Sequence, residues 1–252
     1  MSGHSKWATI KRKKGAMDAK RGQLFTRLTR EIVMAAREGG GDPETNFRLR
    51  LAVEKARSQN MPKENIERAI KRGTGESKEG NVFEQVFYEG YAPHGVALMI
   101  ECYTENRNRT VAEVRHVLSR AGGNLGEAGS VSWQFKRMAY FALSASKIDF
   151  DKVFEVAVEN GAEDVTQDGD TIEVLAPVEN FKVLSDAFRN AKMELEEAEL
   201  RMIPTNEVEL GVEETLQVLR TIDAIEELDD VQNVYHTMKI SEAALAALEN
   251  EA

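Results

Sequence analysis

The chain has 252 residues, room for two or three compact domains, and its 42% hydrophobic and 30% charged residues are typical of an ordered globular protein rather than a disordered one. No apolar run approaches the roughly 20 residues of a membrane-spanning helix, and the N-terminus lacks the apolar core of a secretory signal, so we expect a cytoplasmic protein. The net charge of −10, taken alone, argues against a nucleic-acid partner.

The distribution of charge reverses that argument. Residues 1–73 hold 18 of the 33 Lys and Arg residues and 8 of the 43 Asp and Glu residues, a net charge of +10. Residues 74–252 hold the other 15 basic and 35 acidic residues, a net charge of −20. Charges are screened beyond about 8 Å in physiological salt, so a polyanion responds to the local basic segment. The asymmetry predicts an anionic partner for the first third of the chain, held in one orientation by repulsion from the rest.

Residues 1–15 show neither helical nor strand periodicity and are expected to form a basic tail. A helix is predicted over residues 16–38, ended by three glycines at 39–41. Its apolar residues share one stripe, and its cations lie on roughly the opposite side. The stripe comprises Leu24, Phe25, Leu28, Ile32, Ala35 and Ala36, and the cations are Lys20, Arg27, Arg30 and Arg37. The pattern predicts that one face packs and the other presents positive charge.

Two shorter helices complete the predicted basic domain. Asp42 is the expected N-cap of the second helix, with Pro43 at its first position and its end near Ser58. The third is expected from Pro62, capped by Asn60 or Met61, to Gly73. Together they resemble a helix-turn-helix, whose second helix would carry Lys63, Arg68, Lys71 and Arg72, but three-helix domains commonly contain such a corner without binding DNA.

After the polar linker at residues 74–81, short alternating segments replace the helical pattern. The expected elements are strand 82–89, strand 95–103, helix 110–121 and strand 131–135. From residue 138 the order strand, helix, strand, strand, helix, strand can be traced, with Asp168-Gly169 as a hairpin turn. These elements are strands 138–143, 164–167, 171–175 and 199–203 and helices 150–160 and 178–191. This order predicts a ferredoxin-like unit.

The last segment is predicted to form a helix at 212–227, a strand at 231–238 and a short helix after Ser241, which would complete the sheet begun at residue 82. The predicted fold class is therefore α+β and multidomain: an N-terminal three-helix domain followed by two α/β, ferredoxin-like domains, the third inserted in the second. The predicted domains are residues 1–75, residues 76–136 plus 205–252, and the inserted residues 137–204.

The basic tail and first helix carry the strongest functional signal. Lysine and arginine neutralise phosphates and release counterions, which gives salt-dependent affinity. The predicted phosphate contacts are Lys11, Arg12, Lys13, Lys14, Lys20, Arg21, Arg27 and Arg30. Trp7, beside Lys6, has the aromatic ring needed to stack on an unpaired base. The alternative is a solvated basic face with Trp7 anchoring the tail on the helical core.

A second candidate cluster is Asn106-Arg107-Asn108-Arg109-Thr110, with Asn108 or Thr110 as the expected cap of the following helix. A helix N-terminus with Arg107 and Arg109 suits a phosphate. The alternative is that the two arginines tie domains together by ion pairs.

Enzyme signals are poor. The four histidines are scattered, and no metal-binding, P-loop, dinucleotide-binding or nucleophile-elbow motif is present. Cys102 is expected to be a buried, inert thiol. The acidic groups Glu194, Glu196, Glu197, Glu199 and Asp229-Asp230 are most simply solvated surface. We therefore expect no catalytic residue, cofactor, metal or small-molecule substrate; the oligomeric state is open, with a monomer plausible.

Several motifs closely resemble the YebC/PmpR family of probable transcriptional regulators. They are Gly3-His4-Ser5-Lys6-Trp7, Asp18-Ala19-Lys20-Arg21-Gly22 with Phe25, Arg30-Glu31-Ile32, Gly39-Gly40-Gly41-Asp42-Pro43, Tyr88-Glu89-Gly90-Tyr91, the segment from Asn106 to Arg115, and Asp229-Asp230-Val231-Gln232 with Val234-Tyr235-His236. The resemblance spans nearly the whole chain. It implies a cytoplasmic three-domain protein whose relatives are mostly labelled DNA-binding regulators. The same family includes a mitochondrial translational activator of cytochrome c oxidase subunit I, and bacterial members linked to ribosomes paused on proline-rich sequence.

Three hypotheses follow. The first is a DNA-binding transcriptional regulator. The second is a ribosome-associated translation factor or translational activator that binds ribosomal or transfer RNA, with His4, Lys6 and Trp7 reaching into a functional centre. The third is a scaffold whose acidic domains bind another protein. Phosphate-facing cations serve DNA and RNA equally, so the basic patch does not choose between the first two.

Overall fold

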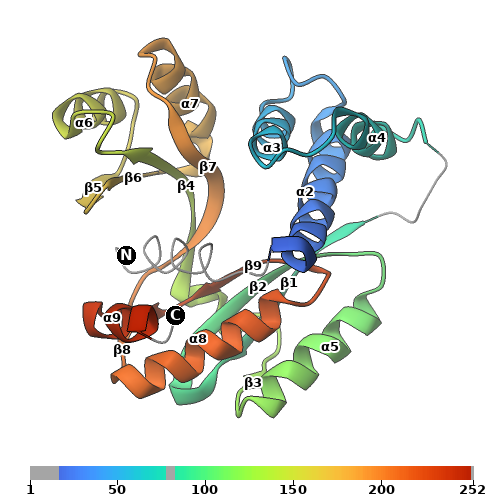
Figure 1. The fold of residues 1–252 in the computed structure, drawn as a ribbon, viewed down its shortest axis with the longest axis vertical. Helices are drawn as coiled ribbons and strands as arrows, with labels where there is room; N and C mark the ends of the chain where they lie inside the picture. The colour runs from blue at the N-terminus through green and yellow to red at the C-terminus, as the bar shows by residue number, and fades with distance from the viewer. Residues whose placement is uncertain (1–16, 78–82, 251–252) are drawn as a thin grey trace.

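The computed structural model describes residues 17–77 and 83–250, with side chains for residues 22–77 and 83–248. The N-terminal domain consists of α2 (Met17–Gly39), α3 (Phe47–Ser58) and α4 (Lys63–Gly73), with α3 and α4 packed against α2 (Figure 1). The predicted apolar stripe of α2 is confirmed: Leu28, Ile32, Ala35 and Ala36 are buried in the core of this domain, and Leu24 and Phe25 pack at its edge. The periodicity of the sequence therefore located the packing face of α2 correctly.

The predicted start of the second helix is wrong. Residues 43–45 form a turn, and α3 begins at Phe47 with Asn46 as its N-cap, because the Asn46 side chain accepts a hydrogen bond from Leu49 N at 3.0 Å and donates to the carbonyls of Ala35 and Gly40 at 2.7 Å. These bonds tie the start of α3 to the end of α2. The third helix was also misassigned at its cap, since Pro62 holds the N-cap position without any side-chain hydrogen bond.

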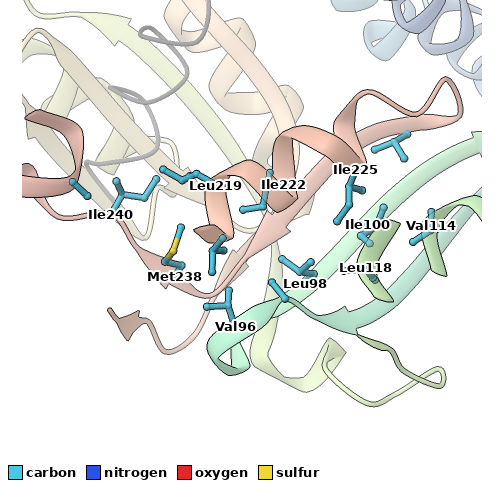
Figure 2. Close-up of a cluster of buried hydrophobic side chains, with 14 of the residues drawn as sticks. Val96, Leu98, Ile100, Val114, Leu118, Leu219, Ile222, Ile225, Met238 and Ile240 are labelled. Carbon is cyan, nitrogen blue, oxygen red and sulfur yellow. The ribbon is translucent and has the colours of Figure 1, made fainter. Parts of the chain in front are cut away.

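The second domain is built on a four-stranded antiparallel sheet in the order β3-β1-β2-β9. The strands are β1 (Glu84–Tyr91), β2 (Ala97–Thr104), β3 (Asn124–Leu125) and β9 (Val231–His236). Helices α5 (Arg107–Arg120), α8 (Val212–Glu226) and α9 (Glu242–Asn250) pack over one face, with η1 (Pro93–Gly95) between β1 and β2. Figure 2 shows this core, in which Leu98 and Ile100 of β2 meet Leu118 of α5 and Ile222 and Ile225 of α8. Segments that are far apart in the sequence thus form one layered unit.

Residues 131–134 do not form the strand predicted at 131–135, and Phe135 begins the following strand instead. Ser132–Gln134 is a 3-10 turn, η2, because the buried carboxylate of Glu89 accepts the backbone N–H groups of Gly129, Val131 and Ser132 at 2.7–2.8 Å. Burial alone would raise the pKa of Glu89, but these three backbone hydrogen bonds lower it below its usual value. The predicted strand at 231–238 is likewise broken: it ends at His236, and β10 (Met238–Lys239) pairs in parallel with β8 (Val208–Glu209).

The third domain is the predicted ferredoxin-like unit. Its order along the chain is β4 (Phe135–Ser144), α6 (Phe150–Glu159), β5 (Asp164–Asp168), β6 (Thr171–Ala176), η3 (Val178–Asn180), α7 (Phe181–Asn190) and β7 (Leu195–Pro204). The sheet order is β5-β6-β4-β7, all antiparallel, with both helices contributing to one core. The helix predicted from residue 178 thus starts as a 3-10 turn. The predicted fold class, with this unit placed between α5 and α8 in the chain, is confirmed.

The first and second domains share a core at their junction. Phe83, at the start of the second domain, and Tyr103 of β2 are buried among the side chains of the helical domain. The guanidinium groups of Arg72 and Arg30 lie 4.4 Å and 5.4 Å from the centre of the Phe83 ring, and Arg37 donates to the Phe83 carbonyl at 2.7 Å. The junction therefore holds the helical domain against the sheet. Within the described residues, no helix has the length and apolar character needed to cross a membrane.

Candidate nucleic-acid interface

Most of the predicted binding residues lie at the very start of the chain. His4, Lys6, Trp7, Lys11, Arg12, Lys13 and Lys14 fall outside the described residues, and Lys20 and Arg21 belong to α2 although their side chains are not described. Their contacts with nucleic acid remain a prediction from the sequence. The structure describes the candidate interface only through the α2 side chains that follow Arg21.

The cations of α2 do not share one exposed face. Arg27 is partly exposed and Arg37 is exposed, but the Arg30 side chain is only 11% exposed and points into the contact with the second domain. Arg30 was predicted to face phosphate, so its placement differs from the expectation. The reason is an acidic partner from the far end of the chain, which the helical periodicity of α2 cannot reveal.

That partner is Asp230, which lies directly before β9 and whose side chain is 1% exposed. Arg30 Nη2 lies 3.0 Å from Asp230 Oδ1, and Arg109 Nη2 donates to Asp230 Oδ2 at 2.6 Å. The hydroxyls of Thr104 and Thr110 donate to the same Oδ2 at 3.1 and 2.7 Å. We call these five residues the Asp230 cluster. It joins α2, β2, α5 and β9 at one buried carboxylate.

Electrostatics keep this carboxylate ionised. Burial raises the pKa of Asp230, but the hydrogen bonds from Arg109 and Thr110 and the charge of Arg30 outweigh it and leave the pKa below its usual value. Burial lowers the pKa of Arg30, and the charge of Asp230 opposes that effect. The Asp229-Asp230 pair was interpreted as solvated surface. That interpretation holds for the exposed Asp229 and is wrong for Asp230.

The Asn106–Thr110 segment begins α5, but its cap is Asn106 and not Asn108 or Thr110. Asn106 Oδ1 accepts from Arg109 N at 3.2 Å, while Thr110 is buried in the Asp230 cluster. Arg107 pairs with Glu84 of β1 at 2.5 Å. Both arginines nevertheless keep exposed surface, 62% for the Arg107 side chain and 51% for that of Arg109. They are ion-paired and still reachable by a ligand.

The helical domain also contacts the third domain through charge. Lys55 of α3 lies 3.4 Å from Glu31 and 3.6 Å from Glu199 of β7, and Glu199 pairs with Arg201 in the same strand. Burial raises the pKa of Glu199, but the charges of Arg201 and Lys55 bring it down to about 2. Glu199 was predicted to be solvated surface and is instead part of this contact, with 23% of its side chain exposed.

An aromatic contact reinforces the same interface. The rings of Phe47 in α3 and Phe181 in α7 meet edge to face with centroids 5.2 Å apart. The helical domain is therefore held by both α/β domains. On its other side, α4 leaves Lys63, Arg68 and Lys71 exposed, whereas Arg72 packs on Phe83 and pairs with Glu105. Three of the four cations of the weak helix-turn-helix candidate thus face outward.

The exposed cations near the Asp230 cluster come from different domains. Arg27 lies one turn before Arg30 on α2, and Arg107 and Arg109 open α5 beside the same cluster. The basic N-terminal part of α2 also contacts the second domain, because Gln23 donates to the carbonyl of Glu227 at the end of α8 at 3.3 Å. The cluster therefore places the middle of α2 beside the start of α5, and sequence motifs alone gave no signal of this pairing.

Comparisons with known proteins cover nearly the entire chain. The model described as the N-terminal domain of TACO1/YebC proteins matches residues 5–76, and that of the TACO1/YebC second and third domain matches residues 83–238. A probable transcriptional regulatory protein of Acidithiobacillus ferrooxidans is 54% identical over 249 residues, 99% of each chain, and one of Chlorobaculum tepidum is 51% identical over all 252 residues and its whole length. The crystal structure of a conserved hypothetical protein from Aquifex aeolicus superposes with a TM-score of 0.82 at 44% identity, covering 89% of this chain and 93% of its own.

Proposed function

The chain belongs to the TACO1/YebC family, and on that premise we propose that it is a cytoplasmic, DNA-binding regulator of transcription that grips DNA through its basic N-terminal domain. The observation that carries the proposal is the charge separation: +10 over residues 1–73 and −20 over residues 74–252. Its relatives are named as probable transcriptional regulatory proteins, which supports a regulatory role.

The proposed nucleic-acid contacts combine the tail with the surface around the Asp230 cluster. They are His4, Lys6, Trp7, Lys11, Arg12, Lys13, Lys14, Lys20, Arg21, Arg27, Arg107 and Arg109. Arg30 has a structural role in this proposal: its ion pair with Asp230, which also binds Arg109, holds α2 in a fixed orientation relative to α5. A charged patch of this kind binds backbone phosphates without reading sequence. Target choice then comes from elsewhere on the complex or from a partner protein.

The protein acts by binding, without catalysis, under this proposal. The acidic remainder of the chain faces away from the polyanion because like charges repel it, so binding occurs in one orientation. The domains we propose are residues 1–75, the discontinuous 76–136 plus 205–252, and the insert 137–204.

The salt dependence of DNA binding tests the proposal. Replacing Lys13 and Lys14 together by Ala should lower the slope of log affinity against log salt by roughly one to two, because each phosphate contact contributes about 0.9. The matched control replaces two exposed lysines of the third domain, Lys182 and Lys192, and should leave the slope unchanged. Equal slopes in all three proteins would show that the tail does not contact phosphate.

Sedimentation of a cell lysate separates DNA from ribosomal RNA as the physiological target. A transcriptional regulator should remain near the top of the gradient and protect promoter DNA. Co-migration with ribosomes that is lost at high salt would instead assign the same basic domain to translation, and would overturn the DNA target.

A further inference from the structure

A groove between α5 and α8 lies outside the proposed nucleic-acid contacts. Its volume is about 450 Å³, within the range of roughly 300–1,000 Å³ that small-ligand sites occupy. The two helices are neighbours on the same face of the sheet β3-β1-β2-β9 (Figure 1). The groove is lined by His116, Val117, Arg120, Ala121, Gln217, Arg220, Thr221 and Ala224.

The lining is cationic in a part of the chain that is otherwise strongly acidic. Arg120 and His116 on α5 and Arg220 on α8 border the groove, and none of its eight lining residues is a carboxylate. Both His116 and Arg120 are exposed on the surface of α5. Helix α5 as a whole carries four arginines against one glutamate. The groove is therefore suited to an anionic occupant.

The floor of the groove adds apolar surface and one oriented amide. Val117, Ala121 and Ala224 contribute methyl groups. Gln217 Oε1 lies 2.9 Å from His94 Nε2, which leaves the amide N–H groups of Gln217 for a ligand. An apolar floor, a polar amide and a cationic border match a nucleotide, whose base is flat and apolar on its faces, polar at its edges and linked to phosphate.

We infer that the α5–α8 groove binds an unpaired nucleotide of the nucleic acid that the basic domain holds. Arg120 and Arg220 contact its flanking phosphates, the His116 ring stacks on the base, and the Gln217 amide donates to a base edge. A single strand fits better than a duplex, because a duplex groove receives a protruding helix or ribbon and this surface is recessed between two helices.

The groove lies close to the proposed interface. Gln23 of α2 touches the carbonyl of Glu227, and Ala224 in the groove lies one turn earlier on the same helix end, about 5 Å along its axis at 1.5 Å per residue. Ala224 thus places one end of the groove next to the contact between α2 and α8. The inference rests on the proposed function, since the groove takes an unpaired segment of the nucleic acid that the basic domain holds.

The test compares full-length variants in their binding to a short oligouridylate and to a DNA duplex of matched length. Arg120→Ala combined with His116→Ala should weaken oligouridylate binding about tenfold, as loss of one stacked base typically does, and leave duplex binding within about twofold. Arg115→Ala is the matched control, because Arg115 is an exposed arginine on the same helix that does not line the groove. Circular dichroism verifies that all variants keep their fold.

The outcomes separate the two proposals. If the unaltered protein does not bind the DNA duplex, the proposed function fails, whether or not it binds oligouridylate. If it binds both probes and the groove variant behaves like Arg115→Ala, the groove inference alone is overturned. If polyglutamate displaces oligouridylate from the unaltered protein but not from the groove variant, the groove recognises acidic peptide, and the nucleotide assignment is wrong.

Discussion

Arg30 Nη2 in the first helix of the basic domain lies 3.0 Å from Oδ1 of Asp230, and the two side chains are 11% and 1% exposed. A buried carboxylate shared by Arg30 and Arg109 connects the basic domain to the sheet below it. Removing one member of a buried ion pair is costly because the remaining charge stays desolvated.

We expect Asp230→Asn to lower the free energy of unfolding by about 3 kcal/mol, because it leaves the Arg30 guanidinium buried without a counter-charge. Urea denaturation of the full chain measures the change. Asp229→Asn is the control, since Asp229 is the exposed neighbour with the same charge. Equal stability of the two variants would mean that Asp230 does not hold the domains together.

The stability contributed by Glu199 should depend on pH. Its pKa is about 2 in the folded protein against an ordinary 4.5, so its contribution is complete above about pH 4.5 and is lost as the pH falls towards 2. The difference in unfolding free energy between the unaltered protein and Glu199→Gln should therefore be largest near neutral pH and shrink in acid. A difference that stays constant from pH 7 to pH 3 would contradict the lowered pKa.

Close packing of α4 on α2 should make Gly73 intolerant of a side chain. A Cβ atom there would lie 2.5 Å from the Val33 carbonyl oxygen and 2.7 Å from Ala36 Cβ, so Gly73→Ala should cost about 1–3 kcal/mol. Gly22→Ala, in the open part of α2 with nothing within 4 Å, should be neutral or stabilise by up to about 1 kcal/mol. Thermal unfolding of both variants measures this difference in stability. Equal stability of the two variants would mean that α4 can move away from α2 at no cost.

Arg27 is a partly exposed cation of α2 on the side of the proposed nucleic-acid contacts. Arg27→Ala should weaken DNA binding and lower the salt slope by about one, as expected for one lost phosphate contact. Lys182→Ala removes an exposed charge from the third domain and should change neither quantity. Identical slopes for both variants would place the DNA elsewhere than along α2.

The sequence predicted elements whose signals are local. The apolar stripe of α2 and the strand–helix–strand order of the inserted domain follow from side-chain periods that neighbours in the chain determine. The cap at Asn46 was missed because its hydrogen bonds to Ala35 and Gly40 depend on how the chain folds back. The 3-10 turn after Val131 was missed because Glu89 imposes it from another strand.

The candidate site shows the same division. The charge asymmetry is visible in composition, and it located the basic domain. The burial of Arg30 and Asp230 cannot be read from composition, because their contact joins residues that are 200 positions apart in the sequence. A charged residue whose partner cannot be identified from the sequence is expected at the surface. The resemblance to a known family marked both residues within motifs but carried no information on their contact.

The placement of Phe83 and Tyr103 inside the helical core has a consequence for how the protein forms during synthesis. The helical domain cannot bury its core fully until residue 103 has left the ribosome, and its ion pair with Asp230 forms only after residue 230 has been made. In a nascent chain, the basic helical domain would thus be exposed before its orientation relative to the second domain is fixed. Only the finished molecule has α2 held beside α5 by the shared ion pairs with Asp230.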